Sequence, residues 1–144
     1  MPYGLAKGRV AAVSTQWKET RDENYDWGAI KTYHSFVGSP GKLSMTTTPD
    51  GSEFSAEIIG YPRQFPAGQH TYNQVHATGI AFTYNEYNIA YQIDATKGES
   101  GAPVLDSDNR VRAIHSRNDV ICNFGARITP NVLYYLNEFI AEND

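Results

Sequence analysis

The sequence has few of the residues that build covalent or membrane-embedded structure. Cys122 is the only cysteine, so no disulfide can form within the chain, and we expect it to be a small buried hydrophobic residue. No apolar run approaches the length of a membrane-spanning helix, which argues against a membrane partner. Residues 1–15 lack the charged-then-apolar layout of a secretion signal, so we expect any such signal to lie outside this chain.

Clusters of basic residues are also absent. Twelve Lys and Arg residues stand against sixteen Asp and Glu residues, for a net charge of −4. Nucleic-acid-binding proteins usually carry a basic patch, so we expect no nucleic-acid partner. The four histidines, His34, His70, His76 and His115, are scattered and lack the spacing of metal ligands, so neither a metal nor a cofactor is expected.

The composition that remains is that of a folded β-protein. A length of 144 residues fits one domain or a large piece of one, and 40% hydrophobic residues indicate a folded chain. Ten tyrosines and twelve glycines favour strands separated by frequent turns. There are no internal repeats or low-complexity tracts that would indicate another organisation.

Short strands with turns between them are predicted over most of the chain. The expected strands are residues 9–13, 27–32, 53–60, 74–84, 87–93, 102–106, 111–116 and 120–128. Residues 39–41, 49–52 and 107–109 are predicted turns, the last of them joining a hairpin. The polar residues 15–24 are expected to form a surface loop.

The C-terminal segment has a different period. Thr129 is a good helix N-cap and Pro130 suits the first helical position. Apolar residues at helical spacing follow on one face: Val132, Leu133, Leu136, Phe139 and Ile140. The sequence therefore predicts an all-β fold, an antiparallel barrel closed by a C-terminal helix.

One serine lies in a glycine-rich turn. Gly98, Glu99, Ser100 and Gly101 run directly into a predicted strand. A serine nucleophile needs a base to take its proton and amide donors for the oxyanion, and flexible glycines permit the tight backbone that supplies such donors. The alternative is an ordinary β-turn. The segment does not fit the nucleophile elbow of α/β-hydrolases, because Ala102 stands where that motif has glycine.

Five ordered segments together resemble the chymotrypsin-like serine proteases, in particular the trypsin-like bacterial glutamyl endopeptidases. They are residues 24–31 (NYDWGAIK), 59–62 (IGYP), 98–104 (GESGAPV), 113–116 (AIHS) and 125–129 (GARIT). The resemblance implies that Ser100 is the nucleophile. It implies that the Gly98 and Ser100 amides bind the oxyanion and that Asp26 orients the histidine base. For Asp26 alone, the alternative is a surface acid beside a strand.

The chain departs from this family at the general base. The family's histidine precedes the aspartate, whereas no histidine precedes Asp26 here. His34 follows Asp26 and lies past the end of the predicted strand, where it does not suit a base. We therefore expect the first of the family's two barrels to be largely missing. Residues 1–38 would carry its last strands with the aspartate, and residues 39–144 would form the C-terminal barrel and helix.

The resemblance also implies a substrate-binding set. His115 would bind the carboxylate of a P1 glutamate, next to Ser116, or it is a buried histidine satisfied by the backbone. Ala95 stands where the family has a hydroxyl residue, with Thr96 one place away. Asp94 lies where an acid binds Lys or Arg in trypsin-like enzymes, or it points away. The P1 preference therefore stays open between Glu and Lys or Arg.

Two further charged residues border these segments. Arg117 is expected to be a solvated loop residue, with a positive charge near the substrate pocket as the alternative. The resemblance implies that Glu99 pairs with an N-terminal amine, as in zymogen-activated relatives, or that it is a carboxylate hydrogen-bonded to nearby backbone.

The resemblance predicts a secreted serine endopeptidase that hydrolyses polypeptides through an acyl-enzyme. This chain alone should be inactive for want of the histidine, which an upstream segment or a separate chain would supply. The alternative is a non-catalytic, protease-like β-barrel that binds a peptide or a protein.

Overall fold

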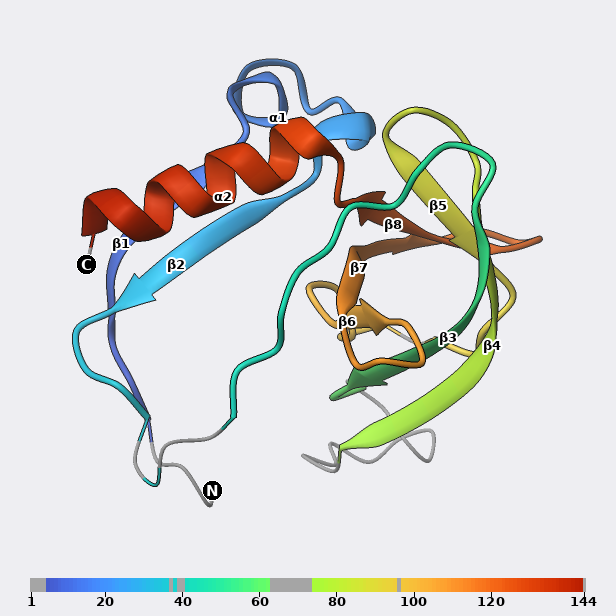
Figure 1. The fold of residues 1–144 in the computed structure, drawn as a ribbon, viewed down its shortest axis with the longest axis horizontal. Helices are drawn as coiled ribbons and strands as arrows, with labels where there is room; N and C mark the ends of the chain where they lie inside the picture. The colour runs from blue at the N-terminus through green and yellow to red at the C-terminus, as the bar shows by residue number, and fades with distance from the viewer. Residues whose placement is uncertain (1–4, 37, 39–40, 63–73, 96, 144) are drawn as a thin grey trace.

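The structure is a computed structural model that describes residues 5–36, 38, 41–62, 74–95 and 97–143. It consists of a two-stranded sheet, a closed six-stranded barrel and a C-terminal helix (Figure 1). The small sheet pairs β1 (Gly8–Val13) with β2 (Gly28–Thr32). Between these strands lie the helix α1 (Thr15–Thr20) and the 3-10 turn η1 (Glu23–Tyr25).

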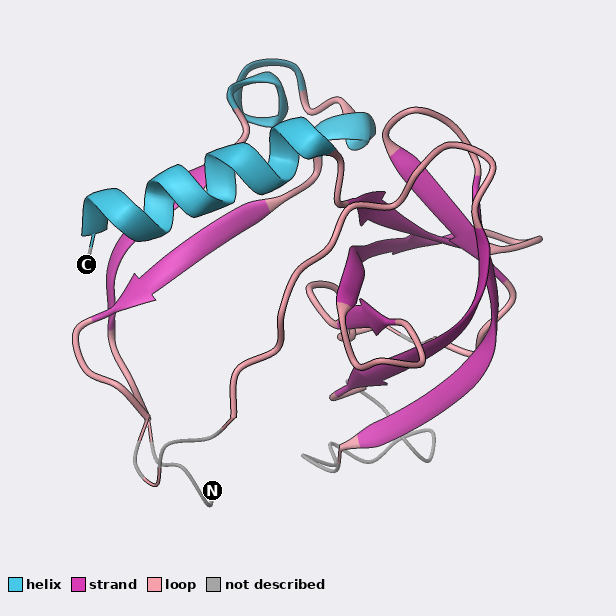
Figure 2. Ribbon diagram, viewed as in Figure 1, coloured by secondary structure: helices cyan, strands magenta, loops and turns pink. Residues whose placement is uncertain are grey.

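The barrel is antiparallel throughout and follows the order β3-β4-β5-β8-β7-β6. Its strands are β3 (Glu53–Gly60), β4 (Val75–Thr83), β5 (Asn88–Tyr91), β6 (Pro103–Leu105), β7 (Val111–Asn118) and β8 (Asn123–Arg127). It closes where β6 pairs with β3, through Glu57 opposite Leu105 and Ile58 opposite Val104. The predicted all-β antiparallel barrel is confirmed, and Figure 2 shows its strands as a group separate from the small sheet.

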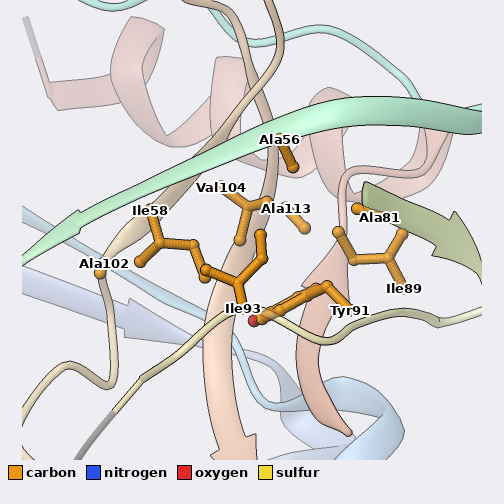
Figure 3. Packing of buried hydrophobic residues seen from close by; sticks show 9 residues of the cluster. All are labelled: Ala56, Ile58, Ala81, Ile89, Tyr91, Ile93, Ala102, Val104 and Ala113. Atoms are coloured by element: carbon orange, nitrogen blue, oxygen red, sulfur yellow. The ribbon is translucent and has the colours of Figure 1, made fainter. Parts of the chain in front are cut away.

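The barrel holds the hydrophobic core. Along the second half of β3 every other residue is buried, which is the period of a strand with one face inside. Figure 3 shows the inward side chains of the cluster, contributed by five strands and the segments beside them: Ala56, Ile58, Ala81, Ile89, Tyr91, Ile93, Ala102, Val104 and Ala113. The segment 98–104 therefore leads directly into this core through Ala102 and Val104.

The C-terminal helix α2 (Pro130–Asn143) forms as predicted, and Val132 N–H donates to the Thr129 hydroxyl at 3.2 Å. It lies along β1 and β2 rather than across the barrel (Figure 1). The rings of Trp27 and Tyr135 stack at 6.4 Å, and Arg9 donates to the Asn143 carbonyl at 2.9 Å. The helix, which follows the last barrel strand in the chain, thus packs against the small sheet.

The segment predicted as a surface loop, residues 15–24, is instead α1 followed by η1. Ser14 caps α1 by accepting from the Trp17 N–H at 3.5 Å. Arg21, at φ 57°, closes it by donating its N–H to the Trp17 carbonyl at 3.0 Å. A capping serine before a polar stretch was the available signal.

Other local expectations also differ in part. The predicted strand 120–128 begins only at Asn123, because β7 extends to Asn118 and residues 119–122 form the connecting loop. Val120 is 99% exposed there, and Cys122 is half-buried rather than buried. The turn at 49–52 is confirmed by a Ser52 N–H to Pro49 carbonyl bond of 3.3 Å. The turn at 39–41 includes residues 39 and 40, which lie outside the described residues.

Candidate active site

The loop that carries Ser100 connects β5 to β6 and is anchored on β7. Gly98 and Gly101 have φ values of 105° and 90°, in the region that favours glycine. The Gly101 N–H donates to the His115 carbonyl at 2.7 Å, and the Ala102 N–H donates to the Glu99 carbonyl at 2.8 Å. These bonds hold a tight loop whose glycines permit the conformation that the sequence predicts for this segment.

Ser100 is exposed at the surface of this loop. Its hydroxyl donates to the Ser116 carbonyl on β7, at 3.3 Å. The loop borders an open hollow of about 540 Å³, whose other wall is formed by the end of β3 and the residues that follow, Ile59, Gly60 and Tyr61. The serine hydroxyl is therefore accessible at the rim of a cavity large enough for peptide side chains.

Close packing against Glu99 explains the glycine at position 60. A Cβ at Gly60 would lie 3.0 Å from the Glu99 Cγ atom. Glu99 directly precedes Ser100 in this loop. It is buried and has at least one interaction. Two segments of the family resemblance, 59–62 and 98–104, thus fit against each other in space.

Asp26 ends the turn η1 and is half-buried. Burial raises the pKa of its carboxyl above the ordinary value, and the nearby Glu23 carboxylate raises this pKa further, whereas Arg117 lowers it. Arg117 Nε pairs with Glu23 Oε2 at 3.3 Å. Since Arg117 directly follows Ser116 on β7, the turn that carries Asp26 meets the strand that accepts the Ser100 hydroxyl.

His115 is 1% exposed and has partners for both ring nitrogens. Tyr91 Oη lies 2.6 Å from Nδ1, and Asn118 Oδ1 lies 3.0 Å from Nε2. Burial lowers the pKa of His115, against the opposing effects of Asn118 and Glu99, so the ring is neutral at neutral pH. The neutral ring is satisfied when Nε2–H donates to Asn118 and the Tyr91 hydroxyl donates to Nδ1.

The remaining substrate-binding candidates occupy different environments. The Ala95 carbonyl accepts from Asn118 Nδ2 at 2.5 Å, which links the loop before Ser100 to β7. Asp94 is exposed, and Thr96 lies outside the described residues. The Ser116 hydroxyl donates to the Phe124 carbonyl at 3.3 Å. Ala95 and His115 therefore share Asn118 as a partner, and Ser116 lies beside Ser100.

The other histidines lie in different settings. His34 is exposed and follows β2, whereas Asp26 precedes that strand, so a strand of about 17 Å separates the two. His76 is exposed on β4 and pairs with Glu57 of β3 at 3.0 Å. His70 lies outside the described residues.

Sequence reasoning missed three residues of this region. The expectation that Arg117 is a solvated loop residue was wrong, because it is part of β7, ion-paired and largely covered. Tyr91 and Asn118 complete the hydrogen bonds of His115. Residues three apart on a regular strand face opposite sides, so the contact of Asn118 with His115 depends on the irregularity of β7 between His115 and Arg117. Nothing in the sequence indicated either partner of His115.

The burial of His115 predicts a pH dependence of folding. Its pKa is lowered in the folded state, so the unfolded state binds more protons in acid. The stability due to neutral His115 is therefore complete above about pH 6.5 and is lost as the pH falls toward the folded pKa. Urea unfolding across this range should show a fall in stability that is smaller in His115→Gln than in wild type. His34→Gln, at an exposed site, is the control; equal slopes for His115→Gln and wild type would contradict the assignment.

Within the described part of the chain, no helix has the length and apolar character to cross a bilayer. Over the same residues, no group of three or more His, Cys, Asp or Glu side chains is arranged to hold a metal ion.

No protein-family model matches the chain. It is 29% identical over 147 residues to an extracellular metalloprotease of Bacillus subtilis, covering 95% of this chain and 46% of that protein. It is 30% identical over 144 residues to the glutamyl endopeptidase of Bacillus licheniformis, covering 91% of this chain and 44% of that protein. The chain thus spans about half the length of the curated relatives it matches, and these relatives are proteases by name.

A solved structure of a Glu endopeptidase in complex with MPD is similar over 96% of this chain and 65% of its own, with a TM-score of 0.88 and 22% identity. The superposition includes the barrel, the small sheet and the helix, since nearly the whole chain is covered. The resemblance that the sequence indicates is confirmed: the chain has the fold of the chymotrypsin-like serine proteases, with one closed barrel and a C-terminal helix.

Proposed function

We propose that this chain is the nucleophile-bearing part of a serine endopeptidase that cleaves polypeptides through an acyl-enzyme. The observation that carries the proposal is the exposed Ser100 hydroxyl, on a glycine loop anchored to β7 and at the rim of an open hollow. The protease relatives support the same reaction class. The name of the B. subtilis relative indicates a metalloprotease. We propose a serine mechanism instead, because of the Ser100 loop.

In the proposed reaction, Ser100 Oγ attacks the carbonyl carbon of the scissile peptide bond. Its proton passes to a histidine, and the carbonyl oxygen becomes an oxyanion that the Gly98 and Ser100 amides bind. The histidine then returns the proton to the leaving amine, which leaves an acyl-Ser100 ester that water hydrolyses. Asp26 orients the histidine and stabilises its protonated form.

The histidine is proposed to come from a segment that precedes residue 1 in the full protein, or from a separate chain. No histidine precedes Asp26 in this sequence, and the chain spans about half of its curated relatives. Residues 1–38 would then contribute the last strands of a first barrel, and residues 39–144 the second. Secretion is proposed on the name of the extracellular relative.

For the P1 residue, His115 is the proposed partner of a glutamate carboxylate, beside Ser116, Ala95 and Thr96. Both ring nitrogens already have partners, so a substrate carboxylate would have to replace Asn118 at Nε2. Asn118 is exposed, which makes this exchange feasible. Asp94 would favour Lys or Arg instead. Cleavage rates of matched peptides with Glu, Lys or Arg at P1 decide between these preferences.

The experiment compares this chain with the full-length protein. We expect peptide hydrolysis and labelling by a fluorophosphonate only for the longer protein, because Ser100 lacks its base here. The absence of both from a folded full-length protein would overturn the proposal.

A second candidate function is a non-catalytic barrel that binds peptides or a protein. It is favoured by the engaged ring nitrogens of His115. It predicts peptide binding by the full-length protein without turnover, and binding that is unchanged in Ser100→Ala.

A further inference from the structure

Arg117 joins two parts of the chain that are far apart in sequence. Its Nε pairs with Glu23 Oε2 at 3.3 Å, and its guanidinium carbon lies 4.5 Å from the centre of the Phe124 ring. The side chain is only 28% exposed, whereas that of Glu23 is 65% exposed. The planar guanidinium of arginine can stack on an aromatic ring and still donate hydrogen bonds from its edge. The ammonium of lysine cannot do both.

The guanidinium has donor capacity left over. Nη1 of Arg117 is buried and has no hydrogen-bond partner among the described residues. A buried donor without a partner is destabilising. The pair with the exposed Glu23 side chain returns little free energy. Stability alone therefore does not explain an arginine at this position.

The group that benefits is the Asp26 carboxylate. Asp26 follows the three residues of η1, and Glu23 is the first of them. The charged groups that act on Asp26 are Glu23 from its own turn and Arg117 from β7. A half-buried carboxylate beside another carboxylate is held more poorly as an anion, and the cation on β7 opposes that effect.

We propose that Arg117 is a positioning residue that clamps the turn of residues 22–26 onto β7 through its pair with Glu23 and its stacking on Phe124, and so holds Asp26 beside the strand that receives the Ser100 hydroxyl. The clamp is a property of this chain. Its consequence for catalysis rests on the proposed function, in which Asp26 must be ionised to orient the histidine.

The test is an NMR titration of the Asp26 side-chain carboxyl carbon in this chain. Arg117→Gln should move the Asp26 titration to higher pH, and Arg117→Lys should move it less, because the charge remains while the fork is lost. Glu23→Gln should move it to lower pH. Arg110→Gln, which removes a cation paired with Asp106 and Asp108, should leave the Asp26 titration unchanged.

Opposite shifts in Arg117→Gln and Glu23→Gln support the clamp. An unmoved Asp26 titration in folded Arg117→Gln, or shifts of the same sign in both variants, would overturn it. If Arg117→Gln does not fold, the same test uses Arg117→Lys and Glu23→Gln. The Asp26 titration should then move to higher pH in Arg117→Lys and to lower pH in Glu23→Gln. In the full-length protein, Arg117→Gln should shift the acid limb of the kcat/KM profile to higher pH. The expected NMR shifts in a protein without peptidase activity would leave the clamp standing and refute only the proposed function.

Discussion

Replacing Ser100 by alanine in the full-length protein is expected to lower kcat about 10⁶-fold, because the proposed attacking oxygen is removed. Peptide hydrolysis under saturating substrate measures the effect. The residual rate should still exceed the uncatalysed reaction by about 10³–10⁴-fold, since the proposed oxyanion donors and the binding surface remain. The variant should fold normally, because Ser100 is exposed and the bond of its hydroxyl to the Ser116 carbonyl is long, at 3.3 Å.

Ser107→Ala is the matched control for this prediction. Ser107 is an exposed serine in the turn between β6 and β7. Its removal should leave kcat at the wild-type value. The free energy of unfolding should stay within about 0.5 kcal/mol of wild type. Wild-type turnover by Ser100→Ala would show that another residue is the nucleophile.

Replacing Arg127 by methionine is expected to lower the free energy of unfolding by about 3 kcal/mol. Arg127 is 6% exposed at the end of β8. Its Nε donates to the Thr48 carbonyl at 2.6 Å, and its Nη1 donates to Asp50 and to the carbonyls of Asn85 and Glu86. Methionine fills part of the volume but leaves the carbonyl of the buried Thr48, and those of Asn85 and Glu86, without this donor.

Urea unfolding measures this loss, with Arg110→Met as the comparison. Arg110 pairs with Asp106 and Asp108, but its side chain is 42% exposed and Arg112 also pairs with Asp106, so its loss should cost less than that of Arg127. Equal losses in the two variants would mean that the loops held by Arg127 do not depend on its hydrogen bonds.

The barrel could be predicted from the sequence because each strand carries its own signal. The alternation in β3, the hairpin of β6 and β7 and the capped helix α2 all depend on neighbouring residues. The helix α1 was missed because its residues other than Trp17 are polar and none is buried, so no apolar period marked it. The cap at Ser14 was the remaining signal, and it is weak alone.

The candidate site was predictable only in part. The glycine loop around Ser100 is a local pattern, and its positive φ values agree with it. The environment of His115 is not local, since Tyr91 reaches it from β5. The pair between Glu23 and Arg117 links η1 to β7. Such contacts follow from the closed barrel and not from spacing along the chain, so the sequence left His115 and Arg117 between two interpretations each.

The central claim is that Ser100 Oγ is the attacking atom, and covalent labelling followed by mass spectrometry tests it most directly. The full-length protein is treated with a fluorophosphonate and digested with trypsin, which should release residues 98–110 after Lys97 and Arg110. The account predicts that the phosphonyl group lies on Ser100 and not on Ser107 of the same peptide. A catalytically active protein that is labelled at another residue, or that stays active while Ser100 is unmodified, would contradict it.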